Sequence, residues 1–142
     1  PHPLPVSTTT KQFATFHLHG LFLGVDVLKV QEVIRYQEMT PVPIAPPMIR
    51  GLINLRGQII TAIDLRRRLD LPDRSGDQLP MNVVIRTDDG GVSLLVDEIG
   101  DVVDLLEGVY KLDGRLLLIL DTEKTANLPA SYNRAAELQY AG

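Results

Sequence analysis

Few side chains in this sequence have the types and spacings that catalyse reactions. A nucleophilic mechanism needs an activated side chain with a base in reach, whereas the chain has no cysteine and only three histidines. Ser93, in the stretch GVSLL, begins like the turn that carries a catalytic serine. However, the second glycine is absent and the residue lies inside a predicted strand. We therefore predict no catalytic residue and no enzymatic activity.

The histidines and paired acids do not form a metal or acid–base site either. His17 and His19 share one face of the predicted first strand, a spacing that suits a metal ion, but no third ligand is near them. A solvent-facing pair is the favoured interpretation. The adjacent acids at 88–89 and 97–98 lie in a turn or on opposite strand faces. GxGxxG, phosphate-loop and HExxH motifs are absent from the sequence. We expect no metal and no cofactor.

Arg56 stands at the corner of a predicted hairpin, between two apolar strands in GLINLRGQIITAIDLR, residues 51–66. We interpret Asn54 and Gly57 as turn residues, since glycine permits a positive φ and asparagine bonds to local backbone. An arginine fixed on a rigid corner loses little freedom when it meets a carboxylate. Arg56 is therefore a candidate docking residue.

The composition predicts a soluble protein of about one domain, with 142 residues, 44% hydrophobic residues and 23% charged residues. No apolar run is long enough to span a membrane, and the N-terminus lacks a secretory signal, so we expect a cytoplasmic protein without membrane insertion. The net charge of −4 argues against nucleic acid as a partner.

Charge is unevenly distributed along the chain. Six of the fourteen basic residues fall within residues 50–74, and eight acids fall within residues 87–113. One face of each sign would suit oriented docking between proteins. Solvated loop charges are the plainer alternative.

An internal repeat divides the chain. Residues 51–66 and 108–123 align without a gap, and the aligned pairs include Gly51 with Gly108, Leu55 with Leu112, Gly57 with Gly114, and Asp64 with Asp121. Upstream, GLFLGVD (20–26) aligns with GVSLLVD (91–97). The pattern predicts a duplicated β unit in which Gly114 is a turn residue like Gly57, and each aspartate caps a short helix.

The connector between the two aligned blocks is fourteen residues shorter in the second copy than in the first. Either a strand has been deleted there, or a loop is missing from the sequence. We favour the second alternative, because removing a strand from a small closed barrel would be costly.

The expected fold is mainly β: two pseudo-symmetric small β-barrels of the SH3-like type, with a few short helices. Strands are predicted at 12–19, 21–26, 32–36, 50–56, 58–64, 81–87, 91–97, 99–105, 108–112 and 115–120, and helices at 65–70, 121–127 and 131–139. We expect one domain, 12–142, with intertwined halves at 12–70 and 80–127. Residues 1–11 would form a flexible N-terminus, and 128–142 a tail or helix.

Four segments together resemble the CheW family of chemotaxis adaptors, over residues 12–127. They are VDVLKVQEVIRY, TPVPIAPPMIRGLINLRGQIITAIDLRRRL, LLVDEIGDVV and GVYKLDGRLLLILDTEK. The resemblance implies a CheW-like fold and a non-catalytic scaffold that couples chemoreceptors to the histidine kinase CheA. The expected partners are the cytoplasmic tip of a chemoreceptor and the regulatory domain of the kinase.

Carried over by position, the resemblance places Val30, Glu32 and Arg56 on the receptor-binding side, and Val33 on the kinase-binding surface. From the residues alone, Val30 and Val33 are also compatible with core positions, and Glu32 with a solvated strand residue. Two other interpretations stay open: a coupling domain of a larger kinase or receiver-fused adaptor, and a small β-barrel that binds nucleic acid through the cluster at 50–74. The end of the chain soon after the last repeat element favours the stand-alone adaptor.

Overall fold

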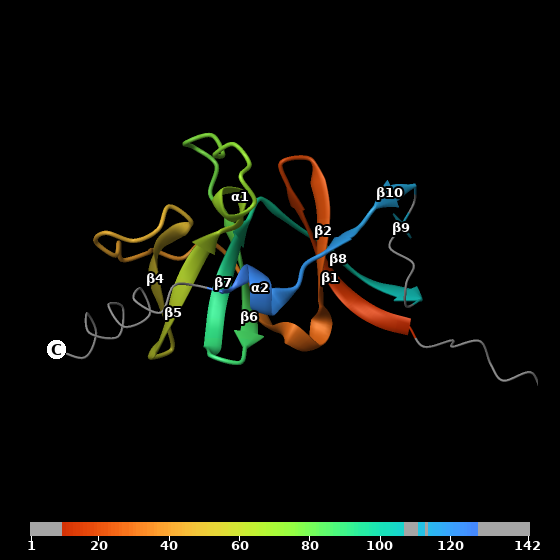
Figure 1. Ribbon diagram of the computed structural model, residues 1–142, viewed down its shortest axis with the longest axis horizontal. Coiled ribbons are helices and arrows are strands. Elements are labelled where there is room, and N and C mark those ends of the chain that lie inside the picture. The colour runs from red at the N-terminus through yellow and green to blue at the C-terminus, as the bar shows by residue number, and fades with distance from the viewer. Residues whose placement is uncertain (1–9, 107–110, 113, 128–142) are drawn as a thin grey trace, which may run out of the picture.

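Two β-sheets and a separate hairpin make up the computed structural model of the protein, which describes residues 10–106, 111–112 and 114–127 (Figure 1). The first sheet has the order β3-β6-β7-β5-β4. Its strands are β3 (Val30–Ile34), β4 (Ile49–Leu55), β5 (Gln58–Asp64), β6 (Met81–Thr87) and β7 (Gly90–Val96). The predicted strands of this sheet are therefore present, with ends shifted by at most two residues.

The second sheet has the order β11-β2-β1-β8. It comprises β1 (Thr10–Leu18), β2 (Leu21–Asp26), β8 (Glu98–Leu106) and β11 (Leu118–Ile119), while β9 (Lys111–Leu112) and β10 (Arg115–Leu116) form the hairpin. The short helices are η1 (Val27–Lys29), α1 (Leu65–Arg68) and α2 (Thr122–Thr125). The predicted strand 115–120 is thus divided in two, and the predicted helix 131–139 lies outside the described residues.

The sequence repeat is visible in the topology. Each sheet combines strands from both copies, and each contains one parallel pair in a corresponding place, β5 with β7 and β11 with β2. The two aligned aspartates both cap helices: Asp64 Oδ1 accepts the Arg66 N–H at 3.1 Å, and Asp121 Oδ1 accepts the Lys124 N–H at 3.1 Å. Local motifs that repeat in the sequence therefore repeat in the structure.

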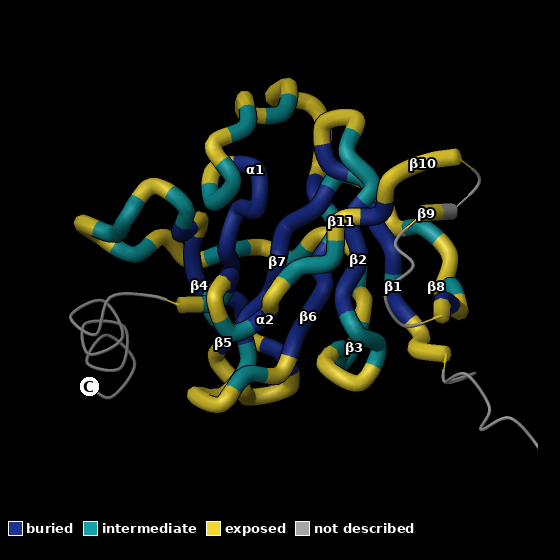
Figure 2. The backbone as a smooth tube through the Cα atoms, turned by 45° about the vertical axis from the view of Figure 1, so that its right-hand side comes forward, coloured by how far each residue is buried: buried dark blue, intermediate teal, exposed yellow. Residues whose placement is uncertain are grey.

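Three clusters of buried side chains make up the core. The buried residues lie mainly along the strands of the two sheets (Figure 2). The largest cluster lies between the sheets and joins β1 and β2, through Phe16 and Leu23, to β5 and β7, through Ile63 and Leu94. The second fills the concave side of the first sheet, whereas the third, at the second sheet, contains three buried residues among those that the structure describes. Apolar burial is the main stabilising term, so the second half depends on its contact with the first.

The mainly β fold with two sheets and a few short helices is as predicted, but the sheets are not closed into barrels: among the described strands, both sheets are open. The first sheet is nevertheless rolled, because the loop 35–48 returns from β3 to the edge of β4. Thr40 and Leu52 exchange two backbone hydrogen bonds of 2.8 Å, and Met39 packs against the concave cluster. Gly51 permits this approach, since a Cβ there would lie 2.7 Å from the Thr40 carbonyl oxygen.

What the second half lacks is a counterpart of the loop 35–48. The strand that corresponds to β3 is present. The strand β8 takes the place that β3 has in the first half, and it pairs with β1 as β3 pairs with β6. The idea of a deleted strand was therefore wrong. The argument from the cost of opening a barrel was also wrong, because the second sheet is open without this loop.

The tip of the loop 35–48 stores backbone strain. Ile44 has φ +55° and its side chain is fully exposed. A left-handed conformation costs an L-residue about 1–2 kcal/mol, and for a β-branched residue it is a true outlier. No burial offsets this cost.

We expect Ile44→Asn to raise the free energy of unfolding by about 1 kcal/mol, because asparagine adopts φ > 0 readily. Urea denaturation measures the change. Leu79→Asn is the matched control, since Leu79 is exposed but has no positive φ; its effect should stay within about 0.5 kcal/mol. An Ile44→Asn protein less stable than the wild type would contradict the interpretation that the backbone at Ile44 is strained.

Candidate protein-docking surface and the buried ion cluster

The corner of the β4–β5 hairpin is a two-residue turn. Leu55 and Gln58 are paired, and Arg56 and Gly57 between them have φ +51° and φ +87°. Two positive φ values identify a type I′ turn, which matches the twist of the strands but favours asparagine and glycine. Asn54 Oδ1 accepts the Gly57 N–H at 2.9 Å. The hairpin therefore holds an arginine at a position that is unfavourable for its backbone.

Arg56 and Glu32 meet in space, although their strands lie at opposite edges of the first sheet. Arg56 Nη2 donates to Glu32 Oε1, and the two side chains are 70% and 23% exposed. The contact is possible because the rolling of the sheet brings β3 beside the turn. An ion pair this exposed stabilises little. Its consequence is geometric: it orients a guanidinium that remains open to solvent.

The two valines of β3 differ in exposure. Val30 is paired with Ile85 and packs against the largest cluster, so its side chain is partly buried. Val33 is paired with Val83 but is 39% exposed. Of the four residues named from the resemblance, Arg56 and Glu32 are therefore in contact, Val33 is a separate apolar point, and Val30 contributes to the core.

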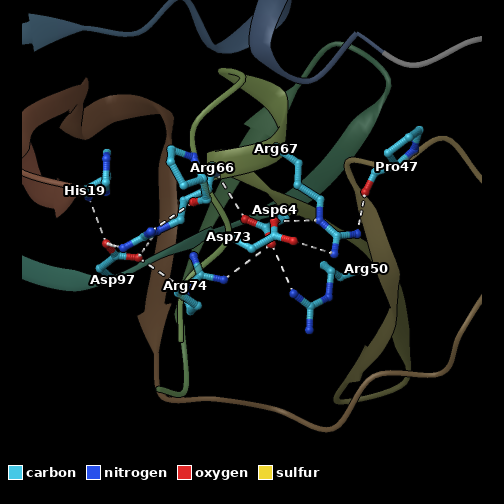
Figure 3. Close-up of polar contacts among 10 residues, drawn as sticks. His19, Pro47, Arg50, Asp64, Arg66, Arg67, Asp73, Arg74 and Asp97 are labelled. Atoms are coloured by element: carbon cyan, nitrogen blue, oxygen red, sulfur yellow. Dashed lines mark hydrogen bonds and ion pairs between the residues drawn. The ribbon is translucent and has the colours of Figure 1, made fainter. Parts of the chain in front are cut away.

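Sequence reasoning missed a cluster of ion pairs that lies between the two sheets (Figure 3). Asp97, at the end of β7, accepts two hydrogen bonds from Arg66, at 3.0 and 2.5 Å, and one from Arg74 at 3.2 Å. Asp64 accepts from Arg74 at 3.4 Å and from Arg50 at 3.1 Å. All but Arg50 are nearly buried.

The cluster ties together segments that are far apart in the chain. The backbone N–H of His19, in the β1–β2 turn, also donates to Asp97, at 2.9 Å. Arg66 Nη1 donates to the carbonyl of Pro72 in the connector between the two repeats. The Val-Asp ending shared by the two upstream blocks was the only sequence signal for Asp97. The basic stretch 50–74 was considered as one charged face, which is wrong for Arg66 and Arg74.

These contacts change ionisation. Burial alone would raise the pKa of Asp97, but hydrogen bonds from Arg66 and from the His19 backbone, with the Arg66 charge and Arg74, lower it below its ordinary value. The hydrogen bond to Asp97 raises the pKa of Arg66 despite partial burial. Both shifts favour the charged forms of Asp97 and Arg66 at neutral pH.

The histidines that were weighed as metal ligands have other surroundings. His17 stacks on Phe22 with ring centroids 5.3 Å apart, and His19 is a turn residue with φ +49°. Within the described residues, no three potential metal-ligating side chains lie together.

With this geometry established, comparisons with known proteins identify the family. Residues 12–107 match the CheW-like domain. The chain belongs to the CheW-like domain family. It is 31% identical over 136 residues to the "Chemotaxis protein CheW" of Klebsiella aerogenes, a match that covers 82% of each chain. The protein of the same name from Treponema pallidum is 32% identical over 105 residues, which cover 71% of this chain and 62% of the relative.

A solved structure supports the fold of this CheW-like domain. The crystal structure of the scaffolding protein TtCheW from Thermoanaerobacter tengcongensis superimposes with a TM-score of 0.76, covering 90% of this chain and 95% of that one at 24% identity. Among the described residues, no helix is long and apolar enough to cross a membrane.

We expect Asp97→Asn to lower the free energy of unfolding by about 3 kcal/mol, because it leaves the nearly buried Arg66 without a charged partner and Arg74 with Asp64 alone. Urea denaturation at neutral pH measures the loss. Asp73→Asn is the control: it also removes a carboxylate from an arginine, Arg67, but Asp73 is exposed, and stability should barely change.

The pH dependence follows from the lowered pKa of Asp97. Its stabilisation is fully present above the unfolded-state pKa, about 3.9, and is lost as the pH falls through the lower folded-state value. The stability difference between the wild type and Asp97→Asn should therefore be constant near neutrality and shrink below about pH 4. A difference that is independent of pH would contradict the assignment.

Proposed function

We propose that this chain is a non-catalytic adaptor that couples chemoreceptors to the histidine kinase CheA. Membership of the CheW-like domain family supports the proposal, as do relatives named as chemotaxis proteins and a structural neighbour named as a scaffolding protein. The main structural observation behind the proposal is the conformation and exposure of Arg56. This arginine has a strained backbone and little ion-pair energy of its own, and it presents its guanidinium to solvent. Such strain is retained where a residue has a role beyond the fold.

The receptor would bind at the Arg56–Glu32 corner. The receptor tip would offer a carboxylate or helix C-terminus to the guanidinium, which Glu32 already orients. Val30 would act from beneath, by packing β3 in place.

The regulatory domain of the kinase would bind at Val33, an exposed apolar side chain on β3. Apolar residues at the centre of an interface contribute most when they become fully desolvated. Because Val33 and Glu32 are adjacent on one strand, both partners would bind to the first sheet. The cytoplasm is the compartment where both would be met.

Nucleic acid is the weaker candidate partner. Two of the six arginines in the basic stretch, Arg66 and Arg74, are nearly buried against carboxylates, which leaves less cationic surface for phosphates.

Arg56→Asn should weaken receptor binding by about 1–3 kcal/mol, the range for interface anchors. It should not lower the melting temperature, because asparagine suits the turn. Calorimetry with a soluble receptor tip fragment and thermal melts on the same preparation measure both. A stabilised protein that binds the receptor fragment as before would remove Arg56 from the site.

The double variant Glu32→Arg/Arg56→Glu separates anchoring from the ion pair. It restores an ion pair at the corner with the charges exchanged, so stability should match the wild type. Receptor binding should stay at least as weak as in Arg56→Asn, because the arginine has moved to β3. Recovery of receptor binding would mean that the ion pair alone is needed.

Val33→Asp should reduce affinity for the kinase regulatory domain at least tenfold, because it buries an unpaired charge. Leu118→Asp is the control, since Leu118 is similarly exposed but lies in the second sheet. Calorimetry with the isolated regulatory domain measures both. Equal losses in the two variants would place the kinase surface elsewhere.

A further inference from the structure

Two buried polar side chains interrupt the apolar concave side of the first sheet. Asn82 on β6 is 1% exposed, and Ser93 on β7 is 0% exposed. Their strand partners, Leu95 and Val84, belong to the concave cluster. Ser93 Oγ donates to Asn82 Oδ1 at 2.7 Å. Two apolar side chains of similar shape would stabilise a core about as well as this hydrogen-bonded pair. Burial alone therefore does not account for the pair.

The amide of Asn82 is directed at the end of β3. Its oxygen accepts from Ser93, and its Nδ2 donates to the carbonyl oxygen of Arg35 at 3.1 Å. Arg35 directly follows β3 and begins the loop 35–48. Because a carbonyl oxygen only accepts hydrogen bonds, the amide atom that faces it is the nitrogen. Gln37 also donates to this carbonyl, at 3.3 Å, from within the loop itself. Asn82 thus ties the end of β3 to β6.

The beginning of β3 is held by the same neighbouring strand. Arg86 Nη1, from β6, donates to the carbonyl oxygen of Val30 at 3.1 Å and to that of Leu28 at 3.4 Å. β3 has five residues, lies at the edge of the sheet, and shifts register between Val30 and Glu32. Short edge segments open more easily than central strands. Glu32 therefore lies between two side-chain attachments that support a weakly paired strand.

The second half contains a corresponding contact at the equivalent position. Thr15 pairs with Gly24 as Asn82 pairs with Leu95, and the repeat aligns Gly24 with Leu95. Thr15 is 2% exposed, and its Oγ1 donates to the carbonyl oxygen of Asp101 in β8 at 2.5 Å. This contact lies at the bulge of β8. In both halves a buried polar side chain thus holds an edge strand where its regular pairing ends or is interrupted.

We propose that Asn82 is a positioning residue for the Arg56–Glu32 corner. By holding the end of β3, it keeps Glu32 where this side chain meets Arg56. Asn82 is almost fully buried, so it acts on a binding partner only through β3. Its effect on receptor binding rests on the adaptor function proposed above, whereas its hold on β3 does not.

Two variants separate this hold from stability. Ser93→Ala keeps the bond from Asn82 to Arg35, but it leaves the buried Asn82 oxygen without a donor and should lower the melting temperature. The double variant Asn82→Leu/Ser93→Ala loses the bond to Arg35 and leaves no unpaired polar side chain at the site. Its melting temperature should lie at or above that of Ser93→Ala.

Hydrogen exchange, followed by mass spectrometry, measures the hold on β3 directly. The amides of residues 30–34 should exchange about tenfold faster in the double variant than in Ser93→Ala. The amides of β5, which Asn82 does not contact through a hydrogen bond, should exchange at equal rates in the two variants. Equal exchange of β3 in the two variants would overturn the positioning role.

Receptor binding is the second measurement, by calorimetry with a soluble receptor tip fragment. Ser93→Ala should bind as the wild type does, and the double variant about fivefold more weakly, because Glu32 no longer orients Arg56. A merely structural pair would make affinity follow stability, with the weakest binding in the less stable variant. That order of affinities would overturn the proposal.

The Arg56→Asn variant distinguishes failure of this inference from failure of the adaptor function. If Arg56→Asn weakens receptor binding but the double variant binds normally despite faster exchange of β3, Asn82 does not position the corner. If Arg56→Asn leaves receptor binding unchanged, the corner is not the receptor site. The exchange rates of β3 then decide by themselves whether Asn82 holds this strand.

Discussion

The carboxylate of Asp97 joins the two sheets by polar contacts. It accepts from Arg66, which follows the last strand of the first repeat, from Arg74 in the connector, and from the backbone of His19 in the second sheet. A buried charge is tolerated only when its partners are in place. The connector, the β1–β2 turn and α1 must therefore adopt their native positions together, and the relative position of the sheets follows from this requirement.

The Arg56–Glu32 corner depends on that arrangement, because it forms only when the first sheet is rolled. Glu32 reaches Arg56 only because β3 and β4, at opposite edges, have been brought together. The loop 35–48 keeps them there by pairing Thr40 with Leu52 and by placing Met39 over the concave cluster. The strained turn at Arg56 is supported by this packing. Strain of this kind persists only where the surrounding structure determines the conformation.

The features that could be predicted from the sequence are those encoded by residues close together in the chain. The turn at Gly57, the strands around it and the two helix-capping aspartates are encoded within a few positions, and the repeat could be found because these short signals recur. The contact between Glu32 and Arg56 joins residues twenty-four positions apart, and Arg66 lies thirty-one positions from Asp97. Such pairs follow from the packing of the sheets, and no local pattern specifies them. For the same reason the basic stretch 50–74 could be interpreted as a surface when two of its arginines are nearly buried.

The difference between the halves has a physical origin in one loop. A duplicated β unit whose strands are exchanged between sheets gives two equivalent sheets with equivalent edges. Closing such an edge requires chain that can cross from β3 to β4, and only the first copy has it. The first sheet can therefore bury its own concave cluster and hold a precise corner, whereas the second keeps a three-residue cluster and an open strand. The half that closes on itself can hold side chains such as Arg56 in fixed positions, where other proteins could bind them. The half that stays open leaves the outer edge of β8 without a partner among the described strands, and the β-bulge in its pairing with β1 makes that edge irregular.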